Sequence, residues 1–103
     1  MKAKIYNLKA WVTETDPDKL KEMLTNLLKA SDFTVLGFND YHFKPYGYSA
    51  LWLISESHLA VHTWPEEHKS YIELSSCNRV KQEKFAKDLH DVFVSATMTT
   101  AGY

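Results

Sequence analysis

The chain has 103 residues, of which 45 % are apolar and 14 % aromatic. This length and composition predict one packed domain over residues 1–103, without room for a second core. Twelve basic and thirteen acidic residues give a net charge of −1, so the sequence lacks the basic face expected of a nucleic-acid binder. It has neither an apolar run of about eighteen residues to span a membrane nor a secretory signal. We therefore expect a cytoplasmic protein whose single cysteine, Cys77, stays reduced.

The first half of the chain predicts two strands around a helix. A strand that is half-buried or at a sheet edge is expected over residues 2–12. Asp16-Pro17 is typical of a helix start, because Asp caps free backbone N–H groups and Pro tolerates the first helical position. Leucine and methionine then recur at helical spacing, which predicts a helix over 17–30. A strand is expected over 33–38, followed by an aromatic bend at 41–47.

The second half predicts three more strands and another helix. Residues 50–54 are apolar throughout, as in a strand of a sheet that is covered on both faces. Alternating patterns predict the next strands, at 58–63 and 70–76. Apolar residues at helical spacing predict a helix over 80–94. The tail at 96–103 has no clear pattern and is assigned no element.

This order of elements predicts an α+β fold. Short connections between the central strands favour antiparallel pairing, with both helices on one face of the sheet. The result is a two-layer sandwich of a mainly antiparallel sheet and two helices. Its other sheet face would stay bare, and a second copy of the chain could cover it. We therefore expect a homodimer with four layers in the order αββα.

Reactive side chains are concentrated between residues 46 and 77, and a metal site is one interpretation. His58, His62, His68 and Cys77 are residue types that bind zinc. If residues 58–62 are extended, however, the first two histidines lie roughly 13 Å apart at about 3.3 Å per residue. One ion cannot bridge that distance, so we expect no metal.

Hydrolysis by Cys77 or Ser57 with a histidine base is a second interpretation. Such catalysis needs a nucleophile, a base and an orienting group in contact, together with an oxyanion hole. Neither the glycines of a nucleophile elbow nor a cysteine-protease signature accompanies these residues. The sequence does not exclude this chemistry, but nothing in it favours it.

Four segments in this stretch keep a definite order and spacing. They are Gly47-Tyr48-Ser49, Ile54-Ser55-Glu56-Ser57-His58-Leu59, His62-Thr63-Trp64-Pro65-Glu66 and Cys77. Ser57 follows Ser49 by eight positions, and His62 follows Ser57 by five. Cys77 follows Ser57 by twenty. In these motifs the chain resembles the bacterial S-adenosylmethionine decarboxylase family, most strongly over residues 42–77.

The resemblance implies a self-processing enzyme. Ser57 would attack the preceding carbonyl, and the chain would be cut between Glu56 and Ser57 to leave a pyruvoyl group derived from Ser57. Decarboxylating an amino acid requires an electron sink, which no standard side chain offers. A Schiff base between the pyruvoyl group and the substrate amine provides that sink. The expected substrate is the small molecule S-adenosylmethionine, and its decarboxylated product would serve spermidine synthesis.

The resemblance also implies individual roles. His62 would remove the α-proton of residue 57, and Ser49 would donate a hydrogen bond to the oxyanion formed during processing. Cys77 would return a proton to the substrate carbon. Substrate contacts would come from an adenine-stacking aromatic, a neighbouring apolar residue and a ribose-binding carboxylate: Phe43, Leu59 and Glu66.

The chain also departs from the family pattern. The usual histidine near the start has no match in Ile5-Tyr6-Asn7-Leu8, and Asn78 replaces the usual glycine. We also expect much of the usual C-terminal extension to be missing. These departures keep two alternatives open, a decarboxylase of ornithine or arginine and a catalytically silent partner subunit. A silent subunit would typically lack Ser57 or Cys77, and both are present.

The spacing of the processing residues predicts active sites shared between two chains. In an extended strand Ser57 and His62 lie roughly 16 Å apart, and their odd separation points them to opposite faces. One chain therefore does not easily bring them together. A two-fold dimer could place Ser57 and Cys77 of one chain against Ser49 and His62 of the other.

Overall fold

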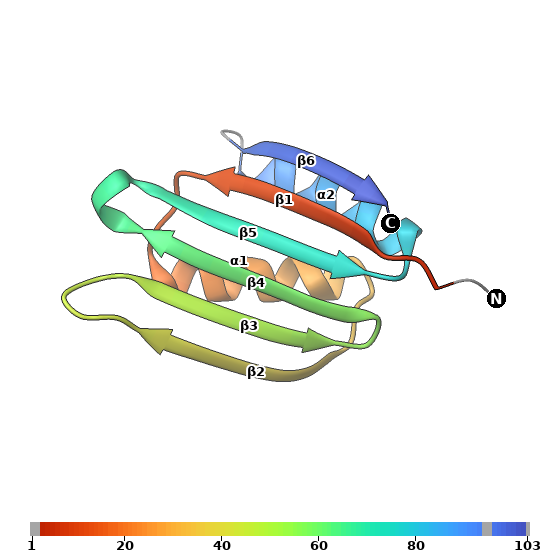
Figure 1. Ribbon diagram of the computed structural model, residues 1–103, viewed down its shortest axis with the longest axis horizontal. Coiled ribbons are helices and arrows are strands. Elements are labelled where there is room, and N and C mark those ends of the chain that lie inside the picture. The colour runs from red at the N-terminus through yellow and green to blue at the C-terminus, as the bar shows by residue number, and fades with distance from the viewer. Residues whose placement is uncertain (1–2, 94–95, 103) are drawn as a thin grey trace.

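Figure 1 shows the computed structural model, which describes residues 3–93 and 96–102. In this part of the chain six strands form one antiparallel sheet in the order β2-β3-β4-β5-β1-β6. Both helices lie on the same face of the sheet (Figure 1). The predicted α+β two-layer sandwich is therefore confirmed. The elements are β1 Tyr6–Val12, α1 Pro17–Ala30, β2 Val35–His42, β3 Tyr48–Ile54, β4 Ser57–Trp64, the short 3-10 helix η1 Pro65–Glu67, β5 Lys69–Ser76, α2 Arg79–Val92 and β6 Thr97–Gly102.

Helix α1 has the predicted bounds, for the predicted reasons. Asp16 caps it by accepting a hydrogen bond from the Lys19 N–H at 2.9 Å, and Pro17 takes the first helical position. Its buried face consists of four leucines that pack on the sheet: Leu20, Leu24, Leu27 and Leu28. Neither helix described here is long and apolar enough to cross a membrane.

The two faces of the sheet differ in what covers them. Alternate residues of the central strands enter a core shared with the helices, among them Leu8, Trp52, Leu59, Ile72 and Leu74. The opposite face, called here the open face, exposes Leu51 and Leu53 of β3 at 48 % and 54 %. Trp11 and Trp64 are also partly exposed. The expectation that residues 50–54 are covered on both faces is therefore wrong for the single chain, because both helices pack on one side.

Strand pairing corrects several predicted boundaries. Strand β2 extends to His42 because this residue pairs with Tyr48, so the bend begins only at Phe43. Strand β1 starts at Tyr6 and is half-buried as predicted, but it lies inside the sheet. The tail that was assigned no element forms β6, which pairs with β1 and becomes the edge. Helix α2 ends at Val92, and residues 2 and 94 of the predicted elements lie outside the described residues.

Candidate active site

Ser49 and His62 form a direct pair on the open face. They are register partners on β3 and β4, and Ser49 Oγ lies 2.7 Å from His62 Nδ1. The pairing of the two strands fixes this contact, since residues opposite each other in an antiparallel sheet bring their side chains together. The two residues are thirteen positions apart in the sequence, and both were predicted to belong to the same site.

A hollow of about 380 Å³ adjoins this pair. Phe43 and Glu66 line it together with Ser49 and His62. Phe43 is brought there by the bend after β2, where Gly47 adopts a φ of +113° and its carbonyl accepts the Phe43 N–H at 2.8 Å. This φ favours glycine, which lacks the Cβ that makes the conformation costly. The bend and η1 thus bring two predicted substrate residues beside the Ser49–His62 pair.

The predicted cleavage site lies in the turn between β3 and β4. Ile54 pairs with Ser57 across the hairpin, which leaves Ser55 and Glu56 as the turn. Both residues of the predicted scissile bond have positive φ, +152° at Glu56 and +144° at Ser57. Such values are unfavourable for residues with a Cβ, at a cost of about 1–3 kcal/mol each. The predicted cut therefore falls on a strained peptide segment.

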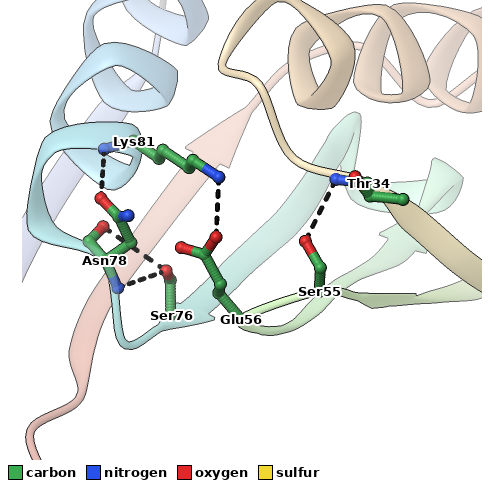
Figure 2. Close-up of polar contacts among 6 residues, drawn as sticks. All are labelled: Thr34, Ser55, Glu56, Ser76, Asn78 and Lys81. Carbon is green, nitrogen blue, oxygen red and sulfur yellow. Dashed lines mark hydrogen bonds and ion pairs between the residues drawn. The ribbon is translucent and has the colours of Figure 1, made fainter.

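Neighbouring elements hold this turn in place (Figure 2). The Ser55 N–H donates to the Thr34 carbonyl at 2.9 Å, and Ser55 Oγ accepts from the Thr34 N–H at 3.3 Å. On the other side, the Cys77 N–H donates to the Glu56 carbonyl oxygen at 3.0 Å. The carbonyl of the predicted scissile bond thus already accepts a backbone hydrogen bond.

The Glu56 side chain is held separately, by the first turn of α2. Lys81 Nζ lies 2.7 Å from Glu56 Oε1, and both side chains are about three-quarters buried. The hydrogen bond to Glu56 is the main reason why the pKa of Lys81 is raised above its ordinary value. Glu56 Oε2 is buried and accepts no hydrogen bond from a described residue. Within the described residues, Lys81 is therefore the hydrogen-bonding partner of this carboxylate.

Asn78, the departure from the family pattern, has a structural role. It is the N-cap of α2, and its side-chain oxygen accepts the Lys81 N–H at 3.0 Å. Its own N–H donates to Ser76 Oγ at 2.9 Å. The φ of Asn78 is −112°, which any residue adopts, so no glycine is needed at this position. Asn is also among the preferred N-cap residues.

The predicted site residues fall into two groups at opposite ends of β4. Phe43, Ser49, His62 and Glu66 lie together at one end. At the other end are Glu56, Ser57 and Cys77, joined by the hydrogen bond from Cys77 to Glu56. Ser57 and His62 are five positions apart along the strand, or roughly 16 Å. Burial alternates along β4 so that His62 belongs to the open face and Ser57 to the helix side.

Leu59, whose contact with the substrate stays a prediction, has its side chain on the helix side of the sheet. It is fully buried and belongs to the core beneath the helices. Strand alternation places its side chain on the face opposite His62, since the two are three residues apart on β4. Its side chain therefore does not reach the open face, and contact with a substrate there would have to come from its backbone.

The two alternative chemistries find little support in the arrangement. Among the described residues, no three His, Cys, Asp or Glu side chains gather closely enough to hold a metal ion. His58 and His62 are four residues apart on β4, and His68 follows η1. In the same part of the chain, no hydrogen bond joins Ser57 or Cys77 to a histidine, as a hydrolase would require.

Comparison with known proteins decides the family. The sequence profile of S-adenosylmethionine decarboxylase matches residues 5–102, almost the whole chain. The chain belongs to this family. The S-adenosylmethionine decarboxylase proenzyme of Thermodesulfovibrio yellowstonii is 32 % identical over 79 residues, which cover 76 % of this chain and 58 % of that protein. The proenzyme of Clostridium botulinum strain Loch Maree is 40 % identical over 58 residues, or 56 % of this chain and 50 % of that protein.

Solved structures of the family share the fold. The adenosylmethionine decarboxylase of Aquifex aeolicus superposes with a TM-score of 0.79 at 21 % identity, covering 100 % of this chain and 91 % of that one. The Trypanosoma brucei decarboxylase monomer gives a TM-score of 0.56 at 17 % identity, over 95 % of this chain and 45 % of that one. The alignments with the first curated relatives span 58 % and 67 % of those proteins' length.

Sequence reasoning missed the residues that hold the turn of this family member. Lys81 looks like any exposed lysine at the start of an amphipathic helix, and Thr34 looks like an ordinary strand residue. The Cys77 N–H belongs to the backbone and leaves no trace in the residue type. Asn78 gave the one available signal, because it stands where the family usually has glycine and is a preferred cap residue.

Proposed function

We propose that this chain is a pyruvoyl-dependent S-adenosylmethionine decarboxylase that generates its own catalytic group by self-cleavage between Glu56 and Ser57. The observation that carries the proposal is the strained turn at this bond, with its carbonyl oxygen bound to the Cys77 N–H at 3.0 Å. Cleavage relieves the strain, and the hydrogen bond is already aimed at the oxygen that becomes negative. The single domain, residues 1–103, would then consist of two fragments.

The first step is an acyl shift from nitrogen to oxygen. Ser57 Oγ attacks the Glu56 carbonyl carbon, and negative charge develops on the carbonyl oxygen that the Cys77 N–H contacts. The carbon–nitrogen bond then breaks, and the departing nitrogen takes up the proton that the hydroxyl gave away. The product is an ester between Glu56 and the Ser57 side chain. Ser49 would assist the oxyanion from the partner chain.

The second step is an elimination. His62 removes the α-proton of residue 57, and Glu56 leaves as a carboxylate with the ester oxygen. The remaining unsaturated amine takes up water and loses ammonia, which leaves the pyruvoyl group at residue 57. The hydrogen bond between Ser49 Oγ and His62 Nδ1 fixes the orientation of the imidazole. In the tautomer whose Nδ1–H donates to Ser49 Oγ, Nε2 is unprotonated and can act as the base, which supports this role.

The chain's remaining residues fit the decarboxylation. A pyruvoyl group supplies an electrophilic carbonyl that withdraws electrons from the substrate as carbon dioxide leaves. Cys77 is exposed next to the turn, where its thiol can return a proton to the substrate carbon. Phe43 would stack on the adenine and Glu66 would accept hydrogen bonds from the ribose, in the hollow beside His62. A working thiol fits a reducing compartment such as the cytoplasm.

A homodimer completes this proposal. Ser57 and His62 lie roughly 16 Å apart in one chain, so the base must come from a second chain. The open face carries partly exposed Trp11, Leu51 and Leu53, which a second copy would bury. The proton to be removed sits on the Ser57 Cα and not on the side chain, so the position of that side chain on the helix side does not exclude a base on the open face.

Mass spectrometry under denaturing conditions tests the cleavage. We expect wild-type protein to yield residues 1–56 and residues 57–103, the second fragment starting with pyruvoyl in place of serine. The Ser57→Ala chain should stay whole, because it has no hydroxyl to attack the carbonyl. Wild-type protein that remains whole after long incubation would contradict the proposal and favour the silent partner subunit.

A substrate comparison tests the specificity. Processed enzyme is incubated with S-adenosylmethionine, ornithine and arginine, and the released carbon dioxide is measured for each. We expect S-adenosylmethionine to turn over fastest, because the hollow combines an aromatic ring with a carboxylate. Faster release from ornithine or arginine would instead support the alternative activity, decarboxylation of one of these amino acids.

A further inference from the structure

The strained turn needs a restraint that balances its cost. Glu56 and Ser57 both have positive φ, and a hairpin of two strands does not by itself impose such values on residues with a Cβ. An unrestrained turn would relax toward ordinary backbone angles, and the Glu56 carbonyl would rotate away from the Cys77 N–H. What fixes the turn therefore also sets the geometry for the attack by Ser57.

Among the described residues, the most buried side-chain contact to this turn is the ion pair with Lys81 (Figure 2). Lys81 Nζ lies 2.7 Å from Glu56 Oε1, while the second carboxylate oxygen is buried without a donor among the described residues. A carboxylate in such surroundings depends on its partner, because an unpaired charge is unfavourable away from water. Without the ammonium group, Glu56 would be driven to turn its side chain out to solvent.

Lys81 is itself fixed, so it can act as an anchor. Its backbone N–H is bound by the Asn78 cap at 3.0 Å, and Asn78 is in turn bound to Ser76 at the end of β5. Its Nζ lies 5.8 Å from the centre of the Phe33 ring, a further contact that favours the cation. Lys81 thus connects the turn between β3 and β4, called here the cleavage turn, to the start of α2 and to the sheet.

We propose that Lys81 is a positioning residue for self-cleavage, which holds the Glu56 carboxylate and thereby keeps the Glu56–Ser57 peptide in its strained, reactive geometry. This inference rests on the proposed function. Lys81 contacts the Glu56 side chain and none of the reacting atoms, so its effect is on the first step, the acyl shift. It should matter little for the proton transfers that follow.

The test compares Lys81→Met with Lys81→Arg and with Lys84→Met as a matched control. Lys84 lies on the same helix and pairs with Asp88 instead of with the turn. The rate of appearance of residues 57–103 is followed by denaturing mass spectrometry. We expect Lys81→Met to cut on the order of tenfold more slowly, because the turn is no longer restrained in a conformation that costs about 1–3 kcal/mol for each strained residue. Lys81→Arg should recover most of the rate, and Lys84→Met should match wild type.

Thermal unfolding separates a positioning role of Lys81 from a role in folding. In the uncut Ser57→Ala background, the thermal unfolding midpoint is compared with and without Lys81→Met. If Lys81→Met unfolds the chain, the cutting rate of Glu56→Gln decides whether the ion pair matters, since this variant removes the carboxylate charge and leaves Lys81 in place.

Hydroxylamine identifies the step that is slowed. It cleaves esters, and it should not speed the cutting of folded Lys81→Met, because the ester forms slowly. Rapid cleavage of that variant by hydroxylamine would place its defect after the acyl shift and overturn the proposal.

The outcomes also distinguish this inference from the proposed function. If wild type and Lys81→Met cut at the same rate, Lys81 does not position the turn, although the chain still processes itself. If wild type does not cut, self-cleavage itself fails and the positioning role falls with it. Slow cutting by folded Lys81→Met or by Glu56→Gln, together with recovery in Lys81→Arg, supports the role.

Discussion

Cys77 contributes two different groups to the same corner of the molecule. Its backbone N–H binds the Glu56 carbonyl at 3.0 Å, and its thiol is exposed beside the turn. In the proposed reaction the N–H serves self-cleavage and the thiol serves decarboxylation. One residue would thus take part in two steps through groups that mutagenesis can separate, because substitution changes the thiol and leaves the N–H in place.

We expect Cys77→Ala to cut itself at a rate within about threefold of wild type but to lose decarboxylation. General acids typically contribute about 10²–10⁴-fold, so carbon dioxide release should fall by on the order of a hundredfold. Fragment masses give the first quantity, and carbon dioxide release by the processed protein gives the second. Undiminished turnover would rule out the thiol as proton donor.

The elements differ in how well local sequence determines them. The bounds of α1 follow from its own residues, because the Asp16 cap and the leucine spacing act within one helix. Strand β6 depends instead on pairing with β1, some ninety residues earlier, and its threonines and glycine give little local signal. The positive φ at Glu56 escaped prediction too, since neither Glu nor Ser indicates such a conformation.

The candidate site was predictable only where it consists of motifs. The resemblance to the family assigned Ser49 and His62 to one site, and strand pairing brings them into contact. The burial of Leu59 was not foreseen, because a motif gives a residue's order in the chain and not its face of the sheet. Lys81 was missed because its role arises from a contact across twenty-five residues.

The short helix η1 allows a test of the proposal that the hollow beside His62 binds the substrate. It presents Glu66 to the hollow, while the adjacent Glu67 pairs with Lys69 at 3.8 Å. We expect Glu66→Gln to raise KM for S-adenosylmethionine about tenfold or more, because hydrogen bonds to a charged group contribute roughly 1.5–3 kcal/mol. Steady-state kinetics measure this, and Glu67→Gln is the matched control. Equal KM values in the two variants would remove Glu66 from the site.

At the scale of the whole molecule, the separation of the two residue groups is the main feature. One end of β4 holds the bond proposed to be cut, and the other holds the proposed base, on the face that no helix covers. A two-fold axis that lies between two facing open faces and runs across the strands would turn one chain end for end relative to its partner. Each cleavage turn would then lie near the partner's Ser49 and His62, and the exposed leucines of β3 would be buried between the sheets.

Complementation between two inactive chains tests this shared site. Ser57→Ala lacks the nucleophile and His62→Ala lacks the base, so neither should form pyruvoyl alone. When they are mixed under conditions of subunit exchange, each mixed dimer contains one complete site, formed by Ser57 of the His62→Ala chain and His62 of the other. Only the His62→Ala chain should be cut, and its fragment 57–103 carries the alanine mass that identifies it.

The control is the His62→Ala chain mixed with a Ser57→Ala/His62→Ala double variant, in which no dimer has a complete site. This mixture should stay whole, and so should the His62→Ala chain with partner omitted. If the first mixture also stays whole although exchange is demonstrated, the base acts within its own chain. That result would require β4 to bring residues five apart in an extended strand into contact, against a separation of roughly 16 Å. Cutting in the first mixture alone is therefore the outcome that the geometry of the single chain predicts.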